Sequence, residues 1–108
     1  MNTNLQIPET WQVLLKKIHA DYAPDFQVWV FGSRATGTAR SGSDLDLYLR
    51  HPDDITPCST LADIRNALSE SNLPIFVDVF DFVSLPAYMK EEVIKTAVCL
   101  FPEQTSKL

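Results

Sequence analysis

All three glycines of this chain, Gly32, Gly37 and Gly42, lie within one short segment. Before this segment, residues 26–31 are rich in strand-forming side chains and end abruptly at Gly32. After it, leucines alternate with polar side chains over residues 44–49, which is the two-residue period of a half-buried strand. Because glycine permits unusual backbone dihedral angles and the close approach of a ligand, the clustering predicts a shaped loop between two strands.

Helical periodicity is found on both sides of this strand pair. Apolar side chains recur every three or four residues over 8–22, and Pro24 stops the helix that this spacing predicts. Residues 60–63 (Thr-Leu-Ala-Asp) resemble a capping box and predict the start of a second long helix. Residues 75–80 are strand formers that follow Pro74 and predict a third strand.

The last part of the chain adds a helix and a short strand. Residues 84–86 introduce a helix that we expect to run through Ala97, followed by a strand at 98–101. The side chains expected to face the core from this helix are Tyr88, Met89 and Val93. The resulting order of elements predicts one mixed β-sheet with helices packed against it, an α/β or α+β fold.

Composition limits the classes of protein and ligand. The length of 108 residues and the apolar fraction of 45% predict one domain over residues 1–108. The net charge of -5 disfavours stable binding of a nucleic-acid polymer. The two cysteines, Cys58 and Cys99, match neither a disulfide framework nor a zinc motif. Without a signal-peptide pattern or a long apolar run, we expect a cytoplasmic protein that does not enter the membrane.

The glycine segment carries features of an anion site. Ser33 stands where a strand ends and a short helix can begin, so its hydroxyl and the following N–H groups can face a phosphate. The segment matches neither the GxxxxGK nor the GxGxxG pattern. Its positive charges, Arg34 and Arg40, are suited to phosphate oxygens, although an arginine in a loop is more often a solvated surface residue.

Two carboxylates follow the loop at once. Asp44 and Asp46 are two residues apart in a predicted strand, so both point to the same face of the sheet, about 6.6 Å apart at their Cα atoms. A solvated strand face produces the same spacing, and alone it is a weak signal. Beside a loop that bears glycine, serine and arginine, the pair predicts a site for hard cations.

A third carboxylate is embedded in an apolar strand. Asp78 lies among valines and phenylalanines, where an acid is costly unless it has a partner. An edge-strand charge that blocks aggregation is the alternative reading. We favour a functional acid that a neighbouring strand brings beside Asp44 and Asp46, whereas Asp81 is expected at the surface. Three aspartates without His or Cys suit Mg²⁺ or Mn²⁺ rather than zinc.

These residues together resemble a known signature. Gly32-Ser33, ten intervening residues and then Asp44-Leu45-Asp46 are similar to the motif of the DNA polymerase β-like nucleotidyltransferases. The string FGSRATGTARSGSDLDLYL over residues 31–49 resembles the minimal nucleotidyltransferases of that superfamily. The close match covers residues 30–50, and the order of elements matches over nearly the whole chain.

The resemblance implies a role for each of these residues. Asp44 and Asp46 would bind the metal, and Asp78 matches the third carboxylate, nearest the acceptor hydroxyl. The residues that would contact the nucleotide, ATP by family analogy, are Gly32 and Ser33, with Arg34, Arg40 and Ser43 as further candidates in the loop.

The resemblance also implies a partner. Minimal nucleotidyltransferases are encoded beside HEPN-domain proteins as toxin–antitoxin pairs, and the antitoxin is similar to an enzyme that moves AMP from ATP onto a tyrosine of the HEPN ribonuclease. Larger members carry an extra domain for the acceptor, so we expect the partner protein to present the acceptor here. We expect this chain to form a hetero-oligomer or a homodimer. Two alternatives stay open: an antitoxin that only masks its toxin in a stable complex, and transfer to a small molecule such as an aminoglycoside.

Overall fold

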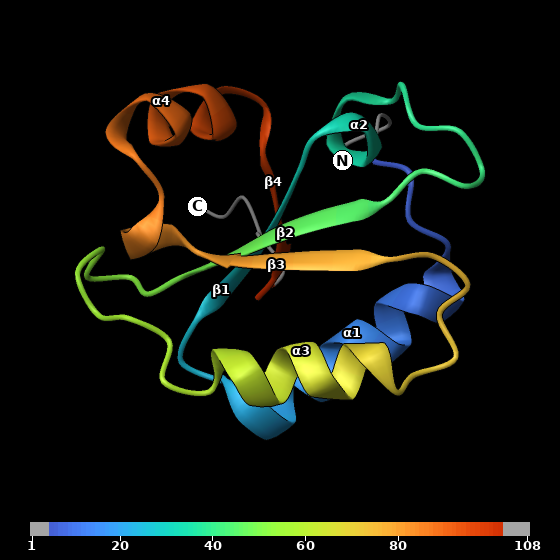
Figure 1. Cartoon of the computed structure of the whole chain (residues 1–108), viewed down its shortest axis with the longest axis horizontal. Coiled ribbons are helices and arrows are strands. Elements are labelled where there is room, and N and C mark those ends of the chain that lie inside the picture. Colours follow the sequence, from blue (N-terminus) through green and yellow to red (C-terminus); the bar gives the residue numbers. More distant parts are fainter. Residues whose placement is uncertain (1–4, 103–108) are drawn as a thin grey trace, which may run out of the picture.

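The computed structural model describes residues 5–102, and its centre is a four-stranded sheet in the order β3-β2-β1-β4 (Figure 1). The strands are β1 (Gln27–Phe31), β2 (Leu45–Arg50), β3 (Val77–Asp81) and β4 (Val98–Phe101). β1 runs antiparallel to both β2 and β4, whereas β2 and β3 are parallel. The predicted mixed sheet is confirmed, and β3 and β4 are its edges.

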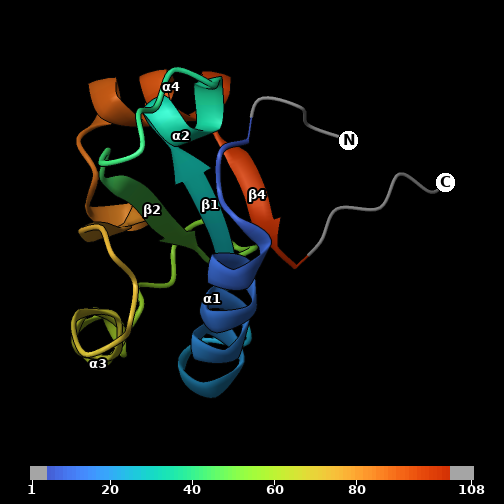
Figure 2. The same ribbon diagram turned by 90° about the vertical axis from the view of Figure 1, so that its right-hand side faces the viewer.

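Helices cover both faces of the sheet (Figure 2). On one face lie α1 (Glu9–Tyr22) and α3 (Leu61–Ser69). On the other lie α4 (Ala87–Thr96), the short α2 (Ser33–Thr36) and a 3-10 turn, η1 (Phe82–Ser84). A parallel β2–β3 pair needs a crossover connection, and α3 is the helix of that crossover. Of the helices in the described part of the chain, none has the length and apolar character needed to cross a membrane.

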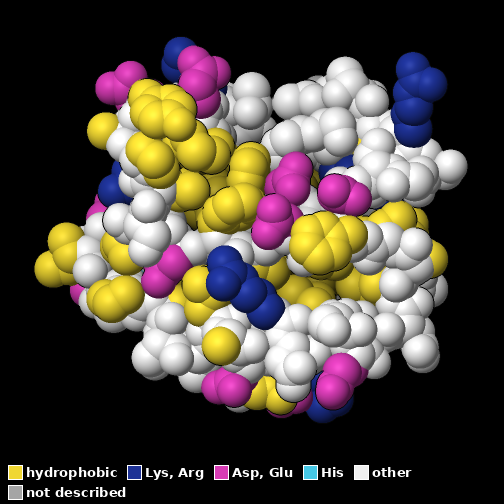
Figure 3. All heavy atoms as spheres, in the orientation of Figure 1, with side chains coloured by type: hydrophobic (Ala, Val, Ile, Leu, Met, Phe, Trp, Pro, Cys, Tyr) yellow, Lys and Arg dark blue, Asp and Glu magenta, His cyan; other side chains and the backbone are white. Residues whose placement is uncertain are grey.

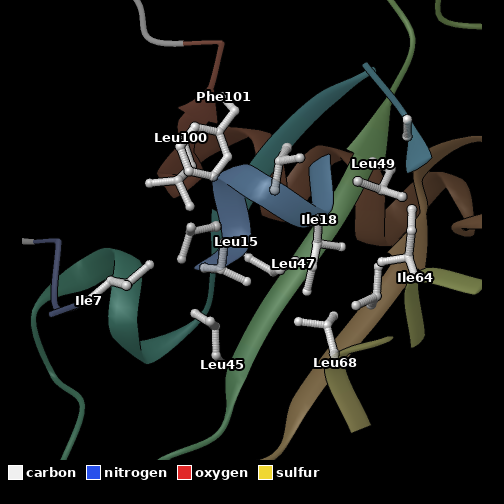
Figure 4. Packing of buried hydrophobic residues seen from close by; sticks show 14 of the residues in the cluster. Ile7, Leu15, Ile18, Leu45, Leu47, Leu49, Ile64, Leu68, Leu100 and Phe101 are labelled. Atoms are coloured by element: carbon white, nitrogen blue, oxygen red, sulfur yellow. The ribbon is translucent and has the colours of Figure 1, made fainter. Parts of the chain in front are cut away.

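The main core lies between the sheet and the helices α1 and α3 (Figure 4). The side chains of β2 that point to this face are Leu45, Leu47 and Leu49, and each is at most 3% exposed. They meet Leu15 and Ile18 of α1, Ile64 and Leu68 of α3, and Val79 of β3. Because burying one such side chain contributes about 1.5–3 kcal/mol, this alternation fixes which face of β2 points inward.

A second, smaller core lies on the opposite face, under α4. Tyr48 of β2 is fully buried there and contacts the rings of Trp29, Phe31 and Phe82. The prediction that β2 is half-buried therefore holds only for its first residues, since its second half is covered on both sides. The uncovered part of this face is the part that carries Asp46.

Three local predictions are wrong. The side chain of Tyr88 is 71% exposed on α4, whereas Val93 is buried as expected. The Thr60 hydroxyl does not cap α3 but donates to the Tyr22 carbonyl at 2.8 Å, which ties α3 to the end of α1. The third strand starts at Val77, two residues later than predicted.

Candidate active site

Two aspartates meet across the parallel strand pair. In the register of β2 and β3, Asp46 lies directly beside Asp78. Both side chains are partly exposed on the sheet face that α4 covers only in part. Asp44 precedes β2 by one residue and is exposed. Figure 3 shows acidic side chains gathered near the middle of the viewed side of the molecule, beside hydrophobic surface.

The electrostatics of Asp46 reflect this grouping. Its pKa is raised above the usual value, first because burial penalises the charged carboxylate and then because Asp78 and Asp44 repel it. Both negative neighbours come from the predicted set, so the charges of Asp44 and Asp78 act on Asp46. A cation placed among them would relieve the repulsion.

Gly32 directly follows the last residue of β1 and lies beside Asp46. Its backbone has a φ of +76°, which side-chain-bearing residues rarely adopt. A Cβ atom at this position would lie 2.7 Å from the Oδ2 atom of Asp46, well inside van der Waals contact. Glycine is therefore required here for two independent reasons, and the bare backbone lies against the carboxylate.

The short helix α2 begins at Ser33, as predicted. The Gly32 carbonyl accepts hydrogen bonds from Ala35 and Thr36 at 3.0 and 3.2 Å, which forms the first turn. The helix ends at Gly37, whose φ of +83° is left-handed and whose N–H donates to the Ser33 carbonyl. The first N–H groups of a helical turn have no acceptor within that turn. The start of α2 therefore offers hydrogen-bond donors beside Asp44, Asp46 and Asp78, here called the acidic group.

Arg34 has a different role from the predicted phosphate contact. Its side chain is buried, and its guanidinium group lies over the Trp11 ring at 4.9 Å. It donates to the carbonyls of Gln6 at 2.8 Å, Ser43 at 2.9 and 3.1 Å, and Ser41 at 3.2 Å. These bonds use the guanidinium N–H groups to close the loop that leads into β2, which fixes the start of that strand.

The other two loop residues are linked to each other. The Ser43 hydroxyl accepts a hydrogen bond from the Arg40 backbone N–H at 2.8 Å, and the Ser43 N–H donates to the Arg40 carbonyl. Ser43 thus stabilises a turn, whereas the Arg40 side chain is exposed. The nucleotide contacts of both residues stay predictions.

The oxygen donors of Asp44, Asp46 and Asp78 suit a hard cation, but these side chains do not form a complete metal site. Among the described residues, no three acidic, histidine or cysteine side chains lie close enough together to hold an ion as they stand. Asp44, Asp46 and Asp78 supply oxygen donors only, and they come from one face of two hydrogen-bonded strands. The fit rests on donor chemistry and on the repulsion of Asp46 by its two acidic neighbours.

Sequence reasoning missed two features next to the site. Asp81 is buried rather than at the surface, and its Oδ2 atom accepts a hydrogen bond from the Cys58 N–H at 2.8 Å. The two-residue period could have revealed this, since it places Asp81 on the core face with Val79. An open groove between α3 and β3 borders Asp78, and no pattern in the sequence indicates it.

Comparisons with known proteins agree with this geometry. The family model described as Polymerase beta, Nucleotidyltransferase matches residues 15–106. The chain is 35% identical over 98 residues to the probable protein adenylyltransferase MntA of Haemophilus influenzae, covering 89% of this chain and 83% of the relative.

Solved toxin–antitoxin assemblies contain chains with a similar fold. One, a toxin–antitoxin with AMP-PNP, has a TM-score of 0.68 at 23% identity and covers 86% of this chain and 74% of the other. A second, an MntA-HpeT variant with two aspartates replaced by glutamates, has a TM-score of 0.66 at 21% identity over the same shares. At these identities the likeness concerns the fold.

Proposed function

Because this chain belongs to the polymerase beta nucleotidyltransferase family, we propose that it transfers AMP from ATP to a tyrosine hydroxyl of a HEPN ribonuclease toxin. The observation that carries the proposal is the pairing of Asp46 with Asp78 beside the bare backbone of Gly32. The MntA relative supports protein as the acceptor, since that protein is named a probable protein adenylyltransferase. The toxin–antitoxin assemblies of the same fold support a toxin as the partner.

Each element of the site has a part in the proposed reaction. Gly32 and Ser33 bind the triphosphate through the donors at the start of α2. Asp44, Asp46 and Asp78 would hold Mg²⁺ or Mn²⁺, which would supply positive charge to neutralise the phosphates. Arg34 contributes indirectly, because it holds the loop that places Asp44.

The chemical step is a displacement at phosphorus. The tyrosine oxygen attacks the α-phosphorus of ATP, and a new P–O bond forms as the bond to the bridging oxygen of the β-phosphate breaks. Pyrophosphate leaves with that electron pair, and the product is an AMP–tyrosine phosphodiester. Asp78 accepts the phenolic proton, since β3 places its carboxylate at the outer end of the acidic group.

The setting of the reaction follows from the same proposal. The chain acts as one nucleotidyltransferase domain over residues 1–108, in the cytoplasm and in complex with its toxin. The transferred AMP silences the ribonuclease covalently, so the antitoxin acts catalytically.

The decisive experiment uses the toxin as acceptor. Incubating this protein with α-labelled ATP, Mg²⁺ and the HEPN toxin should label the toxin, and mass spectrometry should locate one AMP on a tyrosine. Replacing Asp44 and Asp46 with alanine should abolish both labelling and protection of cells from the toxin. Absence of labelling on a folded toxin by the intact protein would overturn the proposal.

A second candidate function is masking without catalysis. The crystal structures of toxin–antitoxin assemblies that contain proteins of the same fold favour it. The repulsion of Asp46 by Asp78 and Asp44 argues against it, because a masking surface gains nothing from a raised pKa of the Asp46 carboxyl. Under masking, the double alanine variant should still protect cells, which separates the two functions in one assay.

A further inference from the structure

The outer edge of β3 borders an open groove next to the proposed reaction site. β3 is the last strand of the sheet, and within residues 5–102 only β2 pairs with it. The groove lies between β3 and α3 and has a volume of about 480 Å³. Its walls include Arg65, Leu68, Leu73, Ile75, Phe76 and Asp78. The groove and the acidic group therefore share one residue, Asp78.

Three hydrogen bonds establish which main-chain groups face the groove. The Leu45 N–H donates to the Phe76 carbonyl at 2.9 Å, so residue 76 points toward β2. The Arg65 guanidinium donates to the Val79 carbonyl at 2.6 and 3.1 Å, so residue 79 points away from β2. Main-chain polar groups alternate along a strand. The N–H and carbonyl groups of Val77 and the N–H of Val79 therefore face the groove.

The chemistry of the groove suits an extended peptide. Its walls are mostly apolar, and Phe76 is 64% exposed at its rim. Its single cation, Arg65, already donates to the Val79 carbonyl, so the groove offers little to a triphosphate or a nucleic acid. An unpaired strand edge supplies main-chain donors and acceptors at the spacing of another strand, and the apolar walls take alternate side chains.

We propose that an extended segment of the acceptor protein adds along the outer edge of β3 and brings its hydroxyl side chain to Asp78. The inference rests on the proposed function, because a protein acceptor must reach the α-phosphate beside that carboxylate. The strand edge at residues 75–79 includes Asp78, so a segment that pairs with this edge lies next to that carboxylate. Main-chain pairing holds the segment, while the groove between β3 and α3 receives the side chains that flank the hydroxyl.

Amide hydrogen exchange tests the pairing itself. In the protein alone, the Val77 and Val79 amides should exchange faster than the Asp78 amide, which faces β2. Adding the HEPN toxin to the Asp46→Asn variant, which should bind it without turnover, is expected to slow exchange at Val77 and Val79 selectively. Unchanged exchange at both amides in a complex shown to form would overturn the proposal. Protection of both amides in the protein alone, with a dimer in sedimentation, would assign the edge to a second copy.

Two groove variants and one matched control test the consequence for labelling. Phe76→Glu places a charge at the rim, and Val77→Pro removes an outward N–H without removing a bond to β2. Ile55→Glu makes the same change as the first at a side chain that is 77% exposed outside the groove. Toxin labelling by both groove variants should fall roughly 30-fold, the scale of losing an interface anchor. Ile55→Glu should label at the rate of the unchanged protein.

A second measurement separates the groove from the reaction site. The rise in melting temperature on adding Mg²⁺ and ATP should be the same for Phe76→Glu, Ile55→Glu and the unchanged protein. Normal labelling by both groove variants would overturn the inference and leave the proposed function intact. Failure of the unchanged protein to label the toxin would instead refute the proposed function.

Discussion

The two halves of the candidate site are built in opposite ways. The half from Gly32 to Asp46 is closed, since the buried Arg34 donates to four loop and N-terminal carbonyls and Gly32 lies directly against a carboxylate. The half around Asp78 is an open strand edge beside a groove. A rigid loop suits a ligand of constant shape, such as a triphosphate. An open edge suits an acceptor that another protein supplies.

The largest expected effect removes the link between the halves. Asp46→Asn should lower AMP transfer about 1,000-fold, within the range for loss of a catalytic group. The same change should raise stability at pH 7 without metal, because the raised pKa means that the ionised carboxylate of Asp46 destabilises the fold. That cost is present above the folded-state pKa and fades as pH falls through it toward the usual 3.8.

Denaturant titrations at several pH values in EDTA provide the measurement. The stability gain of Asp46→Asn should shrink as the pH is lowered. Asp25→Asn, at an exposed aspartate outside the site, should change neither transfer nor this pH dependence. A lower stability of Asp46→Asn than of the unchanged protein at pH 7 would contradict the inference that the ionised Asp46 carboxylate destabilises the fold.

The next effect tests whether the closed half depends on the guanidinium. Arg34→Lys keeps the charge but cannot make the same set of bonds to Gln6, Ser41 and Ser43. We expect a loss of about 3 kcal/mol in unfolding free energy, since buried groups bonded to a charge lose their partners. Arg40→Lys in the same loop is exposed and should stay within about 0.5 kcal/mol. Equal losses of unfolding free energy for Arg34→Lys and Arg40→Lys in urea titrations would show that the closed half does not depend on the Arg34 guanidinium.

A pair of glycine substitutions gives a smaller effect. Gly32→Ala introduces a Cβ at 2.7 Å from Asp46 at a positive φ, and should cost about 2 kcal/mol together with most of the activity. Gly42→Ala has no atom within 4 Å of the added Cβ, so it should be neutral or stabilise by about 0.5 kcal/mol. Melting temperatures of the two variants provide the test. An unchanged melting temperature of Gly32→Ala would show that the close approach of the Gly32 backbone to Asp46 does not require glycine.

The smallest expected effect is that of the metal alone. At about ten times its dissociation constant, Mg²⁺ should stabilise the protein by roughly 1.4 kcal/mol. The shift should vanish in Asp46→Asn and persist in Phe76→Glu, since only the first change touches the acidic group. Differential scanning calorimetry with and without Mg²⁺ measures it. An equal shift in Asp46→Asn would place the ion elsewhere.

The sequence predicted what depends on local period and failed where a distant segment decides. The alternation of leucines with aspartates in β2 correctly placed Asp46 on the outer face, and Asp78 was correctly expected on a neighbouring strand. Arg34 was expected to be available to phosphate, because no local pattern shows that Gln6 folds back over it. Asp81 was expected at the surface although the two-residue period places it on the core face, and only its partner, the Cys58 N–H in a distant loop, lay beyond local prediction.

The parallel pairing of β2 with β3 has a consequence for the newly made chain. The glycine loop and the first two aspartates are complete once residue 46 has been synthesised. Asp78 joins them only after the α3 crossover has been made and β3 has docked beside β2. Pairings between segments far apart in sequence form late in folding. A ribosome-bound chain that lacks β3 therefore carries the motif without the site, and a nucleotidyltransferase of this design cannot act before β3 has docked.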